Sequence, residues 1–380
     1  MIKMRWDLGD PIITADWHLD ASLPYNGIDN AEAAIEEIAE YSTEEDDWGA
    51  IIVAGDVFEN NFLDSETASR FARLMKRLRD KHGTALRIFA MLGNHEMYSQ
   101  DYNILSQYEV FRPDYFVPIL NPTVVVDRST DTAYFFYPYG SETEAIEPDK
   151  ELEDTDGTKL FDLKTVCIMH APVKGIRHDK REIFDSGLSQ KDLRILSGTY
   201  DLIAIGHCHH YYDNVAGLGN IIIPGNPYMK DFNDLDEIKR AVRVRTSEEG
   251  NLADTWESLD LNSFTKFKDI DFNYDHTRDF NQNLDDIRGI LKKYTRHTAR
   301  LKVTNVTLKI KSEISEKIKD FVNTKATYKL KEETNNKKPL LSKNSDNRKE
   351  LMEHIINTDD TTLKKTKLRD IGRKILGEIS

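Results

Sequence analysis

Residues 86–96 read LRIFAMLGNHE, an apolar run that ends in the polar motif GNHE. The same layout recurs at residues 50–58, AIIVAGDVF, where the apolar run ends in GD. Short apolar runs of this kind are typical of strands buried on both faces of an α/β core. Because the carboxyl ends of parallel strands meet at one edge of a sheet, polar motifs at those ends predict a functional site there.

Three further polar motifs follow apolar runs in the same way: DWH at residues 16–18, His170, and GHCH at residues 206–209. Taken alone, each motif has a plain structural explanation, because Asp-x-His arises by chance, Gly-Asp forms turns and a single histidine is often satisfied in the core. Five such motifs after five apolar runs indicate a shared metal site instead. Carboxylate, imidazole and amide oxygen ligands suit manganese, iron or zinc, and the lack of a cysteine cluster argues against a structural zinc site.

The spacing within two of the motifs predicts how their side chains point. In a strand that continues, side chains two positions apart lie on the same side. Asp16 and His18 would then reach one point, and so would His207 and His209, with the residue between each pair facing away. We therefore expect both pairs in the same site.

A pair of adjacent metal ions fits the chemistry of phosphate esters. Two ions hold the attacking and the leaving oxygen, and a metal ion lowers the pKa of bound water from ~15.7 to roughly 7. Asp56 is the natural bridge, because a carboxylate can offer one oxygen to each ion. His95, next to Asn94 in the sequence, is placed to donate the proton that the leaving oxygen needs.

Length and composition exclude several classes of protein. The chain has 380 residues, 39% of them hydrophobic, which predicts two or three globular domains. No apolar run reaches the roughly 18–20 residues that span a bilayer, and the N-terminus lacks the apolar core of a secretion signal, so no membrane contact is expected. Only Cys167 and Cys208 occur, so we expect no disulfide framework and a location in the reducing cytoplasm.

The net charge of −14 is unevenly distributed. Residues 1–260 hold 25 Lys and Arg against 48 Asp and Glu, a net charge of −23. Residues 261–380 hold 27 against 18, a net charge of +9. One interpretation is a solvated, lysine-rich surface, and the other is a region that contacts phosphate groups or a partner protein.

Apolar and helical patterns alternate through the first 230 residues, which predicts an α/β layered core. The expected strands are Pro11–Ala15, Ala50–Ala54, Leu86–Leu92, Thr123–Val126, Ala133–Tyr137, Thr165–Met169, Leu202–Ile205 and Asn220–Pro224. The expected helices are Ala31–Tyr41, Ser65–His82 and Lys191–Leu196. For the second helix, Asp64 is the expected N-cap and Gly83 the stop, and its apolar face packs on the sheet or extends to a dimer contact. We expect Ser141–Thr158 to be an exposed loop or insertion.

After residue 260 the pattern changes to strand, helix, strand, helix, strand. These elements are expected at Lys266–Phe272, Asn281–Tyr294, Thr298–Val306, Ser312–Asn323 and Thr327–Lys331. The order predicts a small α+β domain at residues 261–332, behind a catalytic domain at 1–260. Residues 333–348 are polar and rich in turn formers, which indicates a linker, and residues 349–380 show two helical stretches.

The ordered motifs DWH, GD, GNHE, a later His and GHxH resemble those of the calcineurin-like metallophosphoesterases, over about residues 10–230. The resemblance implies a four-layer α/β/β/α sandwich with two metal ions at one edge. It implies these ligands for one ion: Asp16, His18, Asp56 and His209. It implies these for the other: Asp56, Asn94, His170 and His207. It also implies that His95 is the catalytic histidine.

Finer motifs resemble one branch of that family. DWHLD, GDVF and PGNP (residues 224–227) are similar to motifs of the SbcD-type DNA double-strand-break repair nucleases, and the layout is similar to that of T-even-type phage recombination endonuclease subunits. The resemblance implies a manganese-dependent exonuclease and endonuclease acting on DNA in repair and recombination, with magnesium, iron or zinc as alternative metals. It implies that residues 261–332 cap the DNA and that residues 349–380 bind an SbcC-like coiled-coil ATPase. It also implies a homodimer within a heterotetramer, in the host cytoplasm if the protein is viral.

Three residues depart from the branch pattern: Asp20 replaces a glycine, Glu96 replaces an aspartate, and Glu59 stands where many relatives carry a second histidine. The last change leaves open the balance between exonuclease and endonuclease activity. Two other functions also stay open. One is a phosphodiesterase for nucleotides or phosphoproteins, and the other is a scaffold that kept this fold and lost catalysis.

Overall fold

The computed structural model describes residues 1–43, 49–83, 86–99, 102–106, 115–176, 183–235, 237–246, 250–294, 297–319 and 324–330. Residues up to Leu330 form one compact unit. The predicted linker (333–348) and the helical segment (349–380) lie outside the described residues. Within the described ranges, none of the helices combines the length and the hydropathy needed to cross a bilayer.

Two six-stranded sheets form the larger part of this unit. The first has the strand order β14 (Trp256–Asp260), β13 (Arg240–Val244), β2 (Ile12–Thr14), β3 (Gly49–Val53), β4 (Leu86–Met91) and β7 (Phe116–Ile119). The second has the order β1 (Ile2–Arg5), β8 (Thr123–Asp127), β9 (Thr132–Tyr137), β10 (Lys164–His170), β11 (Leu202–Gly206) and β12 (Ile221–Ile222). A separate hairpin pairs β5 (Met97–Ser99) with β6 (Tyr102–Asn103). Short 3₁₀ helices lie at Leu160–Asp162, Phe232–Asp234, Leu252–Asp254 and Lys292–Tyr294.

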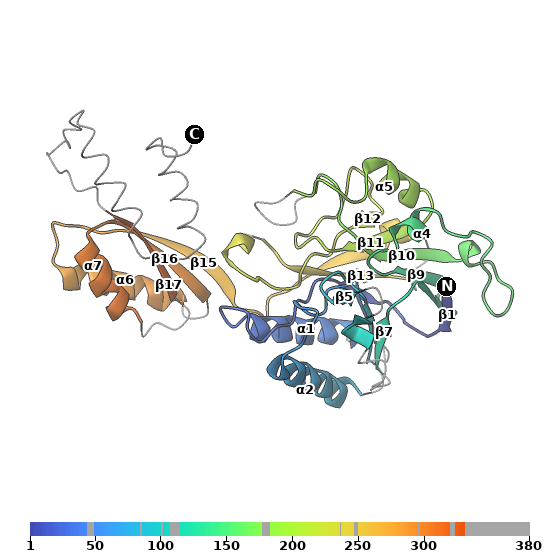
Figure 1. Cartoon of the computed structure of the whole chain (residues 1–380), viewed down its shortest axis with the longest axis horizontal. Helices are drawn as coiled ribbons and strands as arrows, with labels where there is room; N and C mark the ends of the chain where they lie inside the picture. Colours follow the sequence, from blue (N-terminus) through green and yellow to red (C-terminus); the bar gives the residue numbers. More distant parts are fainter. Residues whose placement is uncertain are drawn as a thin grey trace, which may run out of the picture. The chain divides into compact units, whose positions relative to one another are not determined.

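The alternation of side chains along each strand builds the layers. In β3, Ile51 contributes to a core shared with the helices α1 (Gly27–Thr43) and α2 (Ser65–His82), whereas Ile52 contributes to a core between the two sheets. In β10, Ile168 faces the core between the sheets, and Cys167 faces the core beneath α4 (Glu142–Ile146) and α5 (Gln190–Ser197). Figure 1 shows the two helix pairs on opposite sides of the sheets. The predicted four-layer α/β/β/α sandwich is confirmed.

The eight predicted strands and three predicted helices of this part are all present, with ends shifted by a few residues. Among the described residues of this part, six strands lie where none was predicted: β1, β5, β6, β7, β13 and β14. The expectation of an exposed loop at Ser141–Thr158 is wrong in part, because the segment contains α4. In that segment Ala145 is fully buried and Asp154 exposes 8% of its surface.

Helix α2 confirms its predicted ends. The carboxylate of Asp64 accepts hydrogen bonds from the backbone N–H groups of Glu66 and Thr67, and Gly83 ends the helix with a φ of 64°. Its apolar residues, Phe71 among them, belong to the core on the sheet, so the helix packs on the sheet, one of the two predicted arrangements.

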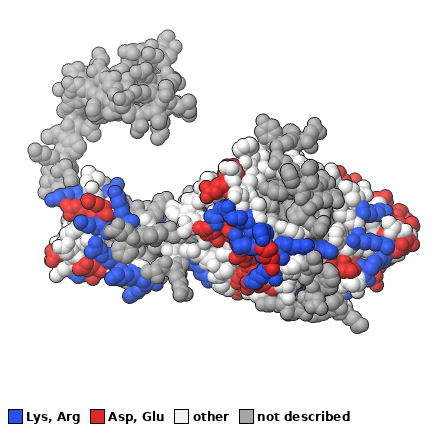
Figure 2. Space-filling view, turned by 90° about the horizontal axis from the view of Figure 1, so that it is seen from below, with Lys and Arg blue, Asp and Glu red and all other residues white. Residues whose placement is uncertain are grey.

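On the face seen in Figure 2, Lys and Arg side chains of the described residues lie among Asp and Glu side chains. Pairs of this kind join α2 to α1, such as Arg70 Nε to Glu32 Oε1 and Arg77 Nε to Glu36 Oε1, both at 2.7 Å.

Residues 266–330 form a smaller sheet with a core of its own. Its elements are β15 (Lys266–Asn273), α6 (Phe280–Leu291), β16 (His297–Val306), α7 (Leu308–Lys317) and β17 (Thr324–Leu330). The three strands are parallel, with β16 in the middle, and each crossover carries one helix. The predicted order of elements is confirmed. Phe267 of β15 contacts Phe232, with ring centroids 4.8 Å apart, which ties this sheet to the larger part.

We expect Leu301→Ala to destabilise the smaller sheet. Leu301 exposes none of its surface in the core of β15, β16 and α6, and a leucine truncated in such a place costs about 2–5 kcal/mol. Leu308→Ala is the matched control, because Leu308 is 67% exposed and its loss should cost less than about 0.5 kcal/mol. Urea unfolding measures both variants. Equal unfolding midpoints would show that this sheet has no core of its own.

Candidate functional site

The candidate site lies where the carboxyl ends of strands from both sheets meet. Strands β2, β3 and β4 lead into Asp16, Asp56 and Asn94, and these strands run parallel to one another. From the other sheet, β10 ends at His170, and His207 directly follows β11. The five polar motifs therefore come together from two sheets, at the kind of strand ends that the sequence predicts.

One group of side chains gathers Asp16, His18 and His209, whose candidate ligand atoms all lie within 4.8 Å of one another. The Nε2 atoms of His18 and His209 are 3.0 Å apart, and His18 Nε2 lies 3.9 Å from Asp16 Oδ1. The His207 backbone N–H fixes the Asp16 carboxylate, whose two oxygens accept from it at 3.2 and 3.1 Å. This group could hold one cation.

A second group gathers Asp56, His170 and His207, again with ligand atoms within 4.8 Å of one another. Asn94 Oδ1 lies between the two imidazoles, 2.9 Å from His170 Nε2 and 2.7 Å from His207 Nδ1. His170 Nδ1 donates to the Ala54 carbonyl at 2.8 Å, so a neutral His170 presents the lone pair of Nε2 to this space. Lone pairs that converge in this way are what a bound cation requires.

Asp56, a member of the second group, also approaches the first group. Its Oδ2 lies 3.9 Å from His18 Nε2 and 3.3 Å from His170 Nε2. Its Oδ1 accepts from the His95 backbone N–H at 3.0 Å, which fixes the carboxylate plane. The arrangement suits a carboxylate that serves both groups.

The backbone reaches this geometry by a different route from the one that the sequence predicts. Strand conformation does not continue through the motifs, because Asp16, His18, Asp56 and His207 have φ values of 55°, 45°, 54° and 92°. Left-handed backbone of this kind is costly for non-glycine residues and gathers at functional sites. The paired side chains still enter one site, but the turns direct them there.

Two glycines allow the loops to approach so closely. Gly55 has a φ of 93°, and a Cβ there would lie 2.6 Å from His170 Cγ. A Cβ at Gly93 would overlap Asp56 Oδ1 and lie 2.8 Å from Asp56 Cγ. Glu96 ties the same two loops together, because its carboxylate accepts from Phe58 N at 2.9 Å and from Gly93 N at 2.8 Å.

Burial sets the charges of the site in the absence of a cation. It raises the pKa of Asp16 to about 8 and lowers the pKa of His18 to about 4. Burial also opposes a charge on His170, but the Asp56 carboxylate outweighs this effect and raises the pKa of His170 to about 9. A protonated histidine thus balances a buried carboxylate here, and a divalent cation could take that part. The donor set of carboxylates, imidazoles and an amide oxygen fits divalent metal ions.

His95 lies at the rim of the first group. Its ring centroid is 4.7 Å from that of His18, at an interplanar angle of 82°. Its Nδ1 donates to the Glu59 carbonyl at 2.6 Å, which leaves Nε2 as the nitrogen that can meet a substrate.

Residues 12–211 match the family model of the calcineurin-like phosphoesterases, which is more than half of the chain. The chain belongs to the calcineurin-like phosphoesterase family. A comparison with curated proteins found no match. Membership in this family implies a metal-dependent hydrolase of phosphoesters, and the two His/Asp groups are where its divalent ions would bind.

Four residues near this phosphoesterase site have contacts that the sequence motifs do not reveal. Glu59 Oε2 lies 2.8 Å from His18 Nδ1 and 2.7 Å from Lys230 Nζ. Glu96 holds two loops, as described above. Tyr139 is 37% exposed, and its ring lies 6.4 Å from that of His207 at an angle of 28°. For Glu59 and Glu96 the available signal is their place within the GDVFE and GNHE motifs, whereas Lys230 and Tyr139 lie outside any motif.

Other residues beside the motifs serve the core. Trp17 is fully buried in the core beneath α1, and Cys208 lies in the core on the far side of the other sheet. His210 Nδ1 lies 2.9 Å from Glu237 Oε1, so it is directed to a carboxylate outside both groups.

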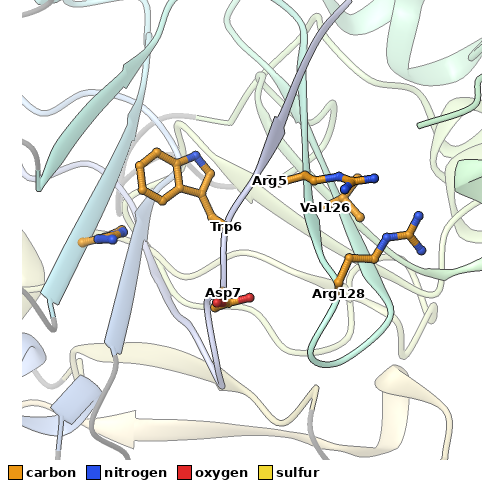
Figure 3. Close-up of a pocket in the computed structure, with 6 residues that line it drawn as sticks. Arg5, Trp6, Asp7, Val126 and Arg128 are labelled. Carbon is orange, nitrogen blue, oxygen red and sulfur yellow. The ribbon is translucent and has the colours of Figure 1, made fainter. Parts of the chain in front are cut away.

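A cavity of about 390 Å³ lies away from this site, lined by Arg5, Trp6, Asp7, Arg87, Val126 and Arg128. Figure 3 shows Arg5 and Arg128 side by side. Both contact Asp154, so these two cations hold the segment after α4. Because β8 is antiparallel to β9, which in turn is parallel to β10, the cavity at the end of β8 lies at the sheet edge opposite His170.

We expect Gly93→Ala to disrupt the phosphoesterase site. The added methyl group has to displace Asp56, at a cost of about 1–3 kcal/mol for overpacking, and manganese affinity should fall about tenfold or more. Gly198→Ala is the control, because the nearest atom to its Cβ would be the Arg194 carbonyl oxygen at 3.5 Å. Urea unfolding and manganese titration measure both effects. A Gly93→Ala variant with unchanged manganese affinity would contradict the close approach seen here.

Proposed function

We propose that this protein is a manganese-dependent nuclease that hydrolyses phosphodiester bonds in DNA. The observation that carries the proposal is the pair of largely buried donor groups on either side of Asp56 Oδ2, within a chain of the calcineurin-like phosphoesterase family. Asp16, His18, Asp56 and His209 would hold one ion, and Asp56, Asn94, His170 and His207 the other. When bound, two such ions supply an activated water and a clamp for phosphate oxygens.

His95 supplies the remaining chemistry. The leaving sugar oxygen needs a proton, and a histidine imidazole is the usual donor. The Glu59 carbonyl occupies Nδ1, so the proton would move from Nε2 of the protonated ring to that oxygen.

Two features favour DNA over a small phosphoester. Tyr139 exposes an aromatic ring beside His207, where a nucleobase could stack. The chain also continues beyond the family match at residue 211 into the parallel sheet of residues 266–330, in the part of the sequence whose net charge is positive. A phosphodiesterase that accepts only small substrates needs neither feature.

The partners in DNA repair are predictions that rest on the sequence resemblance alone. An SbcC-like ATPase and a second copy of the chain are the expected partners, and the segment expected to bind the ATPase, residues 349–380, lies outside the described residues.

We expect His95→Asn to lower the rate of DNA hydrolysis about 10²–10⁴-fold, which is the usual contribution of a general acid. Manganese affinity should stay unchanged, because His95 is not among the proposed ligands. The two measurements are single-turnover cleavage of linear duplex DNA and a manganese titration. Cleavage at the wild-type rate would remove His95 from the mechanism.

We expect Tyr139→Ala to raise KM for linear duplex DNA about tenfold, since stacking of one base on an aromatic ring contributes about 1–3 kcal/mol. KM for bis(p-nitrophenyl) phosphate should not change, and Tyr139→Phe, which keeps the ring, should behave as wild type with both substrates.

The substrates that the wild-type protein hydrolyses distinguish the proposed nuclease from the two alternative functions. Hydrolysis of small diesters or phosphopeptides without DNA cleavage would favour the phosphodiesterase, and no hydrolysis with manganese bound would favour a scaffold.

A further inference from the structure

Glu59 contacts both of the histidines on which the proposed chemistry depends. It follows β3 in the same loop as Asp56, and its backbone N–H donates to the Leu19 carbonyl at 3.3 Å, which fixes the loop beside His18. Its Oε2 lies 2.8 Å from His18 Nδ1, and its backbone carbonyl accepts from His95 Nδ1 at 2.6 Å. One residue therefore holds His18 with its side chain and His95 with its backbone.

These contacts determine which ring nitrogen of His18 is available. The nitrogen that carries the proton in a neutral imidazole is set by the partner of that nitrogen, and a carboxylate holds the proton on the nitrogen that it faces. The Glu59 carboxylate lies 2.8 Å from Nδ1 without a well-aligned hydrogen bond, and its negative charge favours the proton of a neutral His18 on that nitrogen. The lone pair of Nε2 then faces His209 Nε2 at 3.0 Å and Asp56 Oδ2 at 3.9 Å. Without that carboxylate, His18 can present a proton to the cation instead of a lone pair.

The carboxylate itself is already engaged. The oxygen that faces His18 also lies 2.7 Å from Lys230 Nζ, so an ammonium group and an imidazole share it. A cation that took this oxygen as a ligand would have to displace Lys230, whose side chain is only 19% exposed. The geometry therefore favours Glu59 as a support for His18 rather than as a ligand for a further metal ion.

We propose that Glu59 is a positioning residue that prepares His18 to bind one of the two metal ions. The inference rests on the proposed function, because it takes His18 as a ligand. It assigns separate tasks to the two halves of Glu59. The side chain acts on metal affinity through His18, and the backbone carbonyl orients His95, so substitution of the side chain leaves the His95 contact in place.

Manganese titration of the full-length protein, followed by electron paramagnetic resonance, tests the proposal. The wild-type protein should bind two Mn²⁺ and give the spectrum of an interacting pair. In Glu59→Ala, one of the two sites should weaken about 10–100-fold, the usual effect of removing the partner of a ligand histidine, and the spectrum at limiting Mn²⁺ should be that of an isolated ion. In Glu59→Gln the amide oxygen can still face Nδ1–H, so the loss should be under about tenfold.

The control is Glu36→Ala, which removes a carboxylate of equal charge that pairs with Arg77 between α1 and α2, and it should bind Mn²⁺ as wild type does. Two sites of wild-type affinity in Glu59→Ala would overturn the proposal. So would a third Mn²⁺ in the wild-type protein that Glu59→Ala removes, because Glu59 would then be a ligand. If Glu59→Ala does not fold, Glu59→Gln decides, and a loss as large as 100-fold in that folded variant would equally overturn the tautomer argument.

The two failures are distinguishable. Should the wild-type protein bind no Mn²⁺ and cleave no DNA, the proposed function fails and takes the inference with it. Should the wild-type protein bind two Mn²⁺ and cleave DNA while both Glu59 variants bind as wild type, only the role of Glu59 is lost.

Discussion

Two buried aspartates share one edge of the sandwich, and the rest of the site is arranged around them. Asp16 exposes none of its surface and Asp56 only 1%. An ionised carboxylate removed from water costs several kcal/mol unless a cation lies within reach. The groups around the two aspartates are imidazoles and an amide oxygen, which present lone pairs toward the same space. A divalent cation is the counter-charge that such a set needs, so metal binding and the stability of this region are linked.

Close packing of loops from two sheets makes this arrangement of ligands possible. Gly55 leaves room for the His170 ring, and Gly93 leaves room for the Asp56 carboxylate. Left-handed backbone at Asp16 and Asp56 costs about 1–3 kcal/mol each, and it persists because the surrounding contacts hold it. Glu96 is one of those contacts, since it connects the loop after β3 to the loop after β4.

The sequence predicts the parts of the fold in which a local pattern decides the outcome. A strand buried on both faces, such as β3 or β10, is an unbroken apolar run and is found easily. Strand β1, with the sequence IKMR, is mostly exposed, and β14, with WESLD, alternates, so neither carries that pattern. The partner of β1 is β8, which lies far away in the sequence, and the partner of β14 is β13, which was not predicted either.

The candidate site, too, has features that a local sequence pattern predicts and features that it does not. Its candidate ligands follow strands and stand in short motifs, so the sequence predicts which residues converge. The turns that direct them cannot be predicted, because the left-handed backbone at Asp16 or His207 depends on packing between two sheets. The contact of Glu59 with His18 joins residues 41 positions apart, and no local pattern records it.

The same contact bears on how the site would select a substrate. Lys230 approaches His18 through Glu59, and Glu59 already balances its charge. A phosphodiester that reaches this rim would therefore be attracted chiefly by the cations bound between the histidines, which any phosphoester could satisfy. Discrimination has to come from groups that recognise more than phosphate. Tyr139 presents an exposed aromatic ring beside His207, so a choice between a nucleic acid and a small phosphoester would depend on the rim, whereas hydrolysis would depend on the candidate ligands.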